Sequence, residues 1–187
     1  MKKVLLGILF VISGFPVLAE TKAATSMPST NWVAGINYAR FSEEGADLQD
    51  ELNSIGVSLG YDFLQFDRLH LIPELRIGIG VDKEDTRIID GDFDVVADLD
   101  NYIAFSFRGQ LELAYGVYVF AAPAYTNIGY TFFATQTGHS AASMEESWEL
   151  GIGGGAGYRL LKRMSAEFMF EQFNDTDIAT LGLKFNF

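Results

Sequence analysis

Apolar and polar residues alternate with a period of two along most of the chain after about residue 30. The clearest run is Ser54–Phe63, where odd positions are apolar and even positions are Ser, Gly or Asp. Successive side chains of a β-strand point to opposite faces, so this period predicts strands with one apolar face. We expect eight strands, within Trp32–Phe41, Ser54–Phe63, Leu69–Val81, Ile103–Leu113, Val117–Phe133, Glu149–Leu160, Ser165–Glu171 and Thr180–Phe187.

The segments between these strands alternate between short and long. Short turns are expected at Gln65–Asp67, Ala114–Gly116 and Leu161–Arg163, and polar loops at Ser42–Glu51, Asp82–Asp98, Ala134–Glu146 and Asn174–Asp177. An even number of strands of about ten residues, joined in this way, is typical of an all-β, eight-stranded antiparallel up-and-down transmembrane β-barrel. Pro73 and Pro123 each remove a donor from a strand, so we expect bulges there.

The alternation alone does not say which face points outward, since a soluble lipocalin-like barrel with an apolar cavity would alternate too. The polar face consists mostly of Gly and Ser with single Arg and Glu residues, which suits a narrow interior where glycine leaves space for long charged side chains. The many Phe residues of the apolar face would form an aggregating patch in water. We therefore expect the apolar face to meet lipid, with Trp32, Tyr38, Trp148 and Tyr158 at the membrane interfaces.

The N-terminus has the features of a secretory signal peptide. Lys2 and Lys3 precede an apolar run that is broken at Ser13, Gly14 and Pro16, and Ala19 offers a cleavage site. The run is too short for an uncleaved transmembrane anchor. We divide the chain into a signal peptide at 1–19, a flexible leader at 20–29 and a β-barrel domain at 30–187.

The composition narrows the function classes. The net charge of -12 disfavours nucleic-acid binding, and the absence of cysteine excludes disulfides and thiolate sites. Two histidines do not suffice for a multi-histidine metal centre, and we expect no cofactor. Much of the acidity falls in expected loops: Ser42–Glu51 carries five acids and no base, and Asp82–Asp98 carries seven acids against Lys83 and Arg87. These loops would form an acidic rim at one end of the barrel, and such a rim attracts cations and repels polyanions.

Charged residues of both signs occur on the polar, inward face of the expected barrel. Buried charges persist only when they are paired, so we expect an ion-pair network that fills the lumen. The network would comprise Asp62, Glu74, Arg76, Arg108, Glu112, Glu149, Arg159, Glu167, Glu171 and Lys184. The alternative is a narrow, low-conductance pore that opens when ion-pair partners exchange. His70 is expected to be a hydrogen-bonded interior residue.

Two loop motifs could carry chemistry. Asp90, Asp92 and Asp94 are spaced like calcium ligands and are candidates for weak cation binding, although the glycine position does not fit an EF-hand. His139 and Ser140, with Ser143, Glu145 and Glu146 nearby, supply the residue types of a hydrolase. Because His and Ser are adjacent in an expected loop, a lipid A-modifying enzyme is a distant alternative, and we expect no catalytic residues.

The last eight residues, Thr180–Phe187, alternate and end in Phe, as the C-terminal signal of bacterial outer-membrane barrels does. With Trp32–Gly35 and Gly151–Tyr158, this makes residues 30–187 resemble the small OmpA/OmpX-like, porin-like outer membrane protein β-barrel family. No peptidoglycan-binding domain follows, so the resemblance does not imply the tethering role of full-length OmpA.

The resemblance implies a location and partners. The chain would be inserted into a Gram-negative outer membrane by periplasmic chaperones and the barrel assembly machinery, which would recognise Gly182, Phe185 and Phe187. Its partners would be outer-membrane lipids and lipopolysaccharide, and both barrel termini would be periplasmic. The function expected is a non-enzymatic envelope or surface-interaction role, with an unidentified surface or host ligand bound through acidic extracellular loops.

Overall fold

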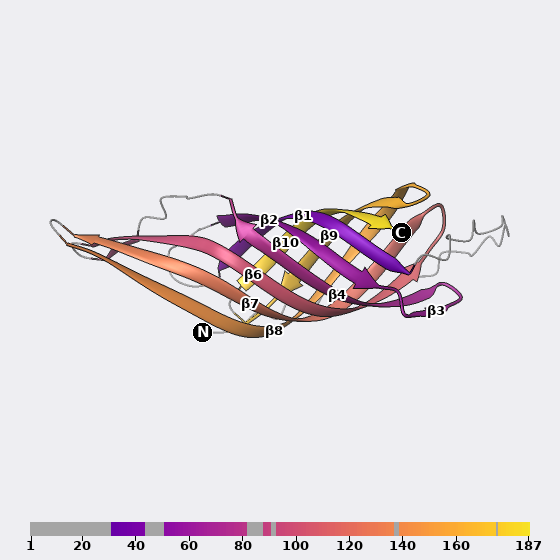
Figure 1. The fold of residues 1–187 in the computed structure, drawn as a ribbon, viewed down its shortest axis with the longest axis horizontal. Helices are drawn as coiled ribbons and strands as arrows, with labels where there is room; N and C mark the ends of the chain where they lie inside the picture. Colours follow the sequence, from indigo (N-terminus) through magenta and orange to yellow (C-terminus); the bar gives the residue numbers. More distant parts are fainter. Residues whose placement is uncertain (1–30, 44–50, 82–87, 91–92, 137–138, 175) are drawn as a thin grey trace, which may run out of the picture.

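A computed structural model describes residues 31–43, 51–81, 88–90, 93–136, 139–174 and 176–187, and these form one closed antiparallel barrel (Figure 1). The barrel strands are β1 (Trp32–Glu43), β2 (Glu51–Tyr61), β4 (Leu69–Gly80), β6 (Phe93–Glu112), β7 (Val117–Gln136), β8 (His139–Leu161), β9 (Met164–Gln172) and β10 (Thr176–Asn186). Two three-residue strands, β3 (Leu64–Phe66) and β5 (Ile88–Asp90), are added to β4 and β6.

Each barrel strand pairs with its neighbours in chain order, and β10 returns to pair with β1. Gly35 lies opposite Lys184 across this closing pair, and β4 pairs directly with β6. The expected eight-stranded antiparallel barrel is therefore confirmed. Within the described ranges, no helix is long and apolar enough to cross a membrane.

The two ends of the barrel differ. At one end, which we call the turn end, short turns at 67–68, 114–116 and 162–163 join the strands, close to where β1 begins and β10 finishes. Tyr115 and Gly116 have φ angles of 58° and 81°, so Gly116 takes the left-handed conformation that the tight turn needs without steric cost. At the opposite end, which we call the loop end, residues 44–50 separate β1 from β2, and only residues 137–138 separate β7 from β8.

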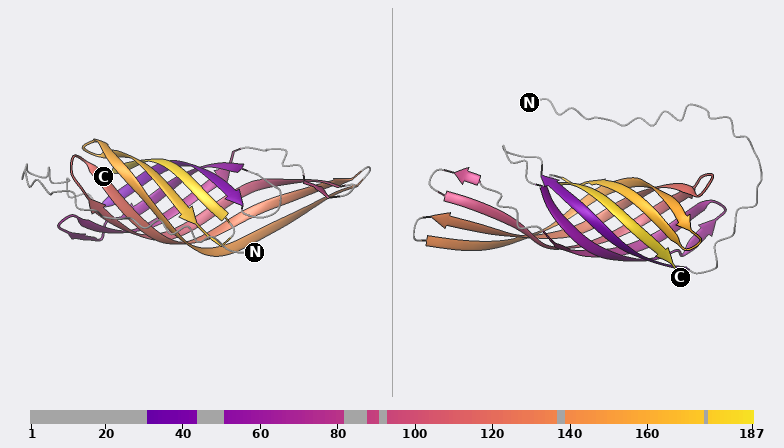
Figure 2. Two further views of the ribbon diagram at one scale, coloured as in Figure 1. Left: turned by 180° about the vertical axis from the view of Figure 1, so that it is seen from behind. Right: turned by 90° about the horizontal axis from the view of Figure 1, so that it is seen from above.

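Three strands extend far beyond the loop end of the barrel (Figure 2). β9 pairs with β8 only from Ile152 onward, whereas β7 and β8 remain paired out to Gln136 and His139. With β5 and the first part of β6, they form what we call the protruding sheet. The expected loops at 82–98 and 134–146 were therefore largely wrong. Both faces of an extension beyond the bilayer meet water, so the alternation that marks the barrel strands is not required there.

The expected bulges at the two prolines were also wrong. Pro73 lies opposite Phe107 and Pro123 lies opposite Ile152 without a change of register. The register shifts fall at Leu99/Asn101 and Arg159/Leu161 instead. At Pro123 the β6–β7 pairing is interrupted but resumes in the same register, so a missing donor is tolerated without an inserted residue.

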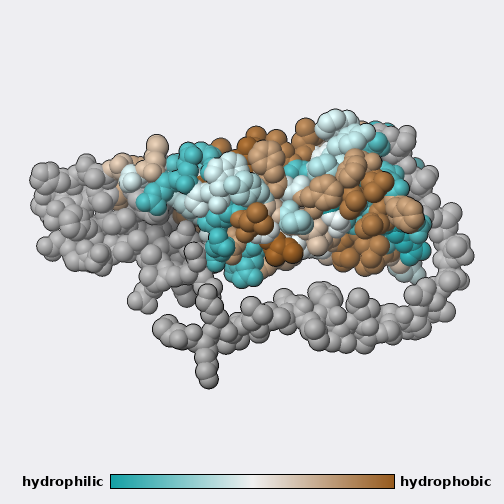
Figure 3. Space-filling view, turned by 90° about the horizontal axis from the view of Figure 1, so that it is seen from below, coloured by the Kyte–Doolittle hydropathy of each residue, from teal (hydrophilic) through white to brown (hydrophobic). Residues whose placement is uncertain are grey.

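Large hydrophobic side chains are exposed on the outer wall of the barrel, and Figure 3 shows them on one face with some hydrophilic residues among them. In β2, the odd-numbered residues from Ile55 to Tyr61 are exposed, whereas Ser54 and Ser58 are buried. This confirms the expected orientation and removes the lipocalin-like alternative, in which the apolar face would line the cavity. The four aromatic residues expected at the interfaces all lie exposed on this wall: Trp32, Tyr38, Trp148 and Tyr158.

Aromatic pairs lie on the wall toward both ends. Trp32 meets Tyr61 edge to face at 5.0 Å between ring centroids, beside the turn end. Tyr125 stacks on Trp148 at 4.8 Å, toward the loop end. Aromatic belts at two levels with an apolar band between them are typical of transmembrane barrels.

Candidate functional site: the barrel lumen and its two ends

Inward-facing residues of β4 mark successive levels along the lumen. From the loop end to the turn end they are Gly78, Arg76, Glu74, Ile72 and His70. Because strand side chains alternate, every second residue of β4 points into the barrel, and all five are buried. The charged members meet opposite charges from strands across the ring, so β4 orders the lumen into layers.

The charged layer nearer the loop end joins β4 to β9 and β10. Arg76 donates two hydrogen bonds to Glu171, each 2.5 Å long, and Glu171 is only 1% exposed. Lys184 donates to Glu74 and also to Ser58 at 2.8 Å, and Glu74 lies 3.7 Å from Nε of Arg76. Removing one partner of such a buried ion pair lowers the free energy of unfolding by about 3–5 kcal/mol, because the remaining charge stays buried and unpaired.

A second charged layer lies one level nearer the turn end, opposite Ile72 of β4. Arg108 donates to both oxygens of Glu167 at 2.8 and 2.6 Å, and to Gln110 at 3.0 Å. Tyr118 donates to the same carboxylate at 2.7 Å. The Arg108 guanidinium also lies 3.6 Å from the centre of the Phe120 ring, a cation–π contact. The pair is therefore held from several strands at once.

The turn end of the lumen holds a third group. A ring nitrogen of His70 lies 2.7 Å from Asp62, whose carboxylate also accepts a hydrogen bond from Gln65 at 2.8 Å. Glu112 accepts from Arg159 and lies 3.7 Å from the second ring nitrogen of His70. His70 is thus a buried, hydrogen-bonded residue of the interior, as the sequence suggested.

The structure brings together nine of the ten residues named for the interior network, in the three groups just described. Glu149 is the exception: it accepts a hydrogen bond from Ser147 at 3.0 Å and has no ion-pair partner among the residues that the structure describes. A cavity of about 30 Å³ lies between Glu74, Arg108 and Glu167, which is room for about one water molecule. The charged groups therefore fill most of the lumen at their level.

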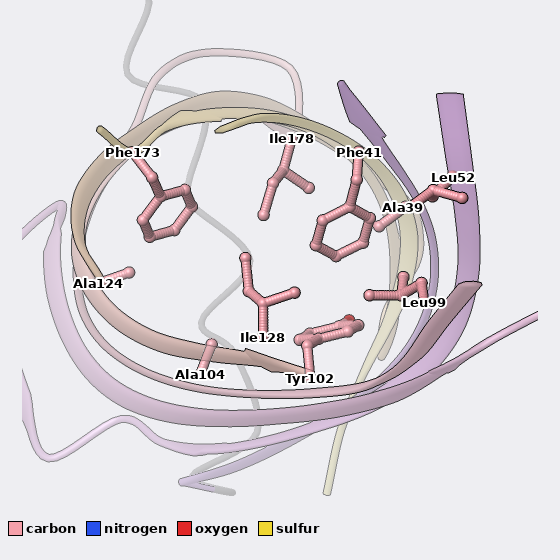
Figure 4. Packing of buried hydrophobic residues seen from close by; sticks show 10 residues of the cluster. All are labelled: Ala39, Phe41, Leu52, Leu99, Tyr102, Ala104, Ala124, Ile128, Phe173 and Ile178. Carbon is pink, nitrogen blue, oxygen red and sulfur yellow. The ribbon is translucent and has the colours of Figure 1, made fainter. Parts of the chain in front are cut away.

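Sequence reasoning missed an apolar plug that occupies the lumen toward the loop end (Figure 4). Ile178, Phe41, Ile128 and Tyr102 project from four strands toward the barrel axis, and Phe173, directly after β9, projects there too. The full plug comprises Ala39, Phe41, Leu52, Leu99, Tyr102, Ala104, Ala124, Ile128, Phe173 and Ile178. The available signal was a set of apolar residues at inward-facing positions near the strand ends, such as Phe41 and Ile128.

Interior glycines leave space for neighbouring side chains, but only in part for charged ones. A Cβ atom at Gly35 or Gly153 would collide with Lys184 or Glu171, as expected. At four other positions the neighbour is an aromatic ring instead: Gly78 against Tyr102, Gly151 against Phe173, Gly155 against Phe120, and Gly157 against Tyr118. The lumen is therefore packed with rings as well as charges.

The protruding sheet is acidic. Residues 88–107 and 109–158 contain no lysine or arginine, while Asp90, Asp92, Asp94, Asp98 and Asp100 fall within the first of these ranges. Asp100 accepts a hydrogen bond of 2.5 Å from Thr131, and Glu145 and Glu146 are exposed on β8. The described residues of the protruding sheet thus include carboxylates and no lysine or arginine.

The loop motifs are only partly described. Asp90 ends β5, and Asp94 lies in β6 opposite Ile89, so the backbone register does not place the two aspartates opposite each other. Asp92 lies outside the described residues, and weak cation binding stays a prediction. Within the described part of the chain, no three acidic or histidine side chains form a metal-binding group.

The segment with His139 and Ser140 is not a loop. His139 lies opposite Gln136 and Ser140 opposite Thr135 in the paired strands β8 and β7. Ser143, Glu145 and Glu146 follow along the same strand. The residue types of a hydrolase therefore occur along one strand of the protruding sheet.

The residues named as an assembly signal lie in or directly after β10. Phe185 and Phe187 are exposed on the outer wall, and Gly182 lies opposite Asn37 of β1. Phe187 also exchanges two backbone hydrogen bonds with Trp32, which closes the barrel at its turn end. These residues are accessible along the seam where the first and last strands meet.

No protein-family model matches the sequence, and no curated protein matches it. Solved structures do match. Ail, the attachment invasion locus protein of Yersinia pestis, has a TM-score of 0.56 at 15% identity, and the match covers 84% of this chain and 97% of Ail. Ail in complex with the heparin analogue sucrose octasulfate gives 0.52 at 16% identity, with coverage of 84% and 97%.

Neisserial surface protein A (NspA) has a TM-score of 0.51 at 13% identity, with 83% of this chain and 97% of NspA covered. At these identities the similarity establishes the fold alone. The fold is that of the small OmpA/OmpX-like outer-membrane barrels, as the sequence resemblance indicated.

Proposed function

We propose that this protein is a non-enzymatic outer-membrane surface protein that binds cationic partners through its protruding sheet. The observation that carries the proposal is the pairing of β7 and β8 far beyond the barrel, on an extension that carries acids and no lysine or arginine. A paired sheet holds its side chains in a fixed arrangement outside the bilayer, at lower entropic cost than a free loop. The barrel then serves as the anchor.

The location and orientation belong to this proposal. The apolar wall and the similarity to outer-membrane barrels support an outer-membrane location, and the N-terminal sequence supports export through a cleaved signal peptide. We place the turn end with both barrel termini in the periplasm and the protruding sheet outside the cell. Insertion by the barrel assembly machinery, with Gly182, Phe185 and Phe187 in the recognised strand, and contact with lipopolysaccharide are parts of the same proposal.

The chemistry of the expected ligand follows from charge. Ail has been solved with a sulfated, anionic ligand, whereas the extension here would repel a polyanion. We therefore expect a basic polypeptide as the partner. Carboxylates on a sheet, spaced by the strand repeat, suit a partner with several Lys or Arg side chains.

Binding of polylysine and heparin to the purified protein in phosphatidylcholine nanodiscs tests the proposal. We expect polylysine to bind, with an affinity that falls as salt rises, and heparin not to bind. Glu146→Gln on the protruding sheet should weaken polylysine binding about two- to fivefold, whereas Asp67→Asn, which removes one exposed carboxylate at the opposite end, should leave it unchanged. Equal losses in both variants, or preferred binding of heparin, would contradict a binding site on the sheet.

A further inference from the structure

The turn end carries exposed cations. Arg68 lies in the turn between β3 and β4, and Lys162 and Arg163 form the turn between β8 and β9. We call these three residues the cationic collar. All three are exposed, and none forms an ion pair with another described residue.

Most acidic side chains at the turn end are paired inside the barrel. Asp62 is buried against His70, and Glu112 is held by Arg159 inside the lumen. Asp67 is the exposed side-chain carboxylate of the described turns. The side chains of the turn-end surface are therefore net positive, in contrast to the acidic loop end.

The collar directly adjoins the apolar wall. Leu161, 64% exposed, precedes Lys162, and Phe66, 75% exposed, lies two residues before Arg68. Tyr115 in the third turn is 94% exposed. Exposed apolar side chains at the edge of a lipid-facing wall, one or two residues before Lys162 and Arg68, place these cations at the depth of lipid headgroups. Free phosphate in solution would not use the apolar part of this surface.

We propose that the cationic collar binds the headgroups of anionic phospholipids in the leaflet that surrounds the turn end. Guanidinium groups bind phosphate oxygens through paired hydrogen bonds, and the net positive charge favours an anionic headgroup over a zwitterionic one. With the orientation proposed above, this is the periplasmic leaflet, and the acidic loop end faces the other leaflet. The selectivity itself does not depend on that orientation or on the surface-binding role.

Electron paramagnetic resonance with spin-labelled lipids tests the proposal. The protein is reconstituted in phosphatidylcholine bilayers, and the motionally restricted fraction of labelled phosphatidylglycerol is compared with that of labelled phosphatidylcholine. We expect about a threefold preference for phosphatidylglycerol at low salt, and close to none at about 1 M NaCl, where charges are screened. Wild-type protein with no preference at low salt overturns the proposal, whatever the variants do.

Charge variants locate the preference. The triple variant Arg68→Gln/Lys162→Gln/Arg163→Gln should lose it, and Asp67→Asn should increase it. Arg40→Gln removes one exposed cation toward the loop end and should leave it unchanged. A preference that survives in the triple variant overturns the assignment to the collar. Because polylysine binding is measured at the opposite end, failure of either proposal leaves the other open to its own test.

Discussion

The glycine at position 78 allows the ring of Tyr102 to lie directly against the barrel wall. A Cβ atom at this position would collide with the ring and lie 2.9 Å from the carbonyl oxygen of Ile55. Tyr102 in turn packs against Phe41 at 5.5 Å between ring centroids and donates to Asn37 at 2.9 Å. The methyl group of an alanine at position 78 would therefore disturb both the packing of Tyr102 in the plug and its hydrogen bond to Asn37.

We predict that Gly78→Ala lowers the free energy of unfolding by about 1–3 kcal/mol, because the ring of Tyr102 must move out of a filled space. Gly109→Ala is the matched control, since its new Cβ would lie 3.8 Å from the nearest atom, a Leu71 methyl group. It should be neutral or slightly stabilising. Urea titration of the folded protein in detergent micelles measures the free energy of unfolding of both variants. An equal effect of the two changes would show that the space at Gly78 for the ring of Tyr102 is unimportant.

Sequence reasoning found the charged residues that face inward but not how they pair. Alternation placed Arg76 and Glu171 on the polar face, yet they are 95 residues apart and meet only because β4 and β9 lie across the ring. The inward apolar residues Phe41 and Ile178 were present in the sequence as well. They were not recognised as a plug because a charged lumen was expected throughout.

The strands were predictable only where each of their two faces meets a different environment. Within the bilayer one face of β2 meets lipid and the other lines the lumen, so alternation marks the strand. From Ala142 to Trp148, β8 is exposed on both faces and carries no such pattern. Its strand form is set by hydrogen bonds to β7, which a single sequence does not reveal.

The orientation of the strands gives a prediction that uses the absence of cysteine from the chain. We expect Glu146→Cys, on the protruding sheet, to react in intact cells with a maleimide polymer too large to cross the outer membrane. Asp67→Cys, in a turn at the opposite end, should react only after the outer membrane is permeabilised. Both positions are exposed, so accessibility of the thiol alone does not separate them. The reverse pattern would show that the barrel is inserted the other way round.

At the scale of the whole molecule, the lumen is closed twice along its length. The apolar plug lies toward the loop end, and the ion-pair layers of Arg76, Glu74 and Arg108 lie below it. Ions entering the plug would lose their hydration without a polar partner. An exchange of ion-pair partners, as in the narrow-pore alternative, would open the ion-pair layers but leave the apolar plug closed.

We therefore predict that the folded wild-type protein gives no conductance steps in planar bilayers in about 1 M KCl. Phe41→Ala/Phe173→Ala opens the plug alone and should also remain silent, since Arg108 and Glu167 still fill the lumen beneath. Adding Arg76→Ser/Glu171→Ser and Arg108→Ser/Glu167→Ser removes two whole ion pairs, one from each layer beneath the plug, so that no charge stays buried alone, and should produce small steps. A shift in mobility of unheated samples on a detergent gel confirms that each variant is folded. Steady steps from the wild-type protein would show that the closures open spontaneously, and steps from the plug variant alone would show that the ion pairs do not seal the barrel.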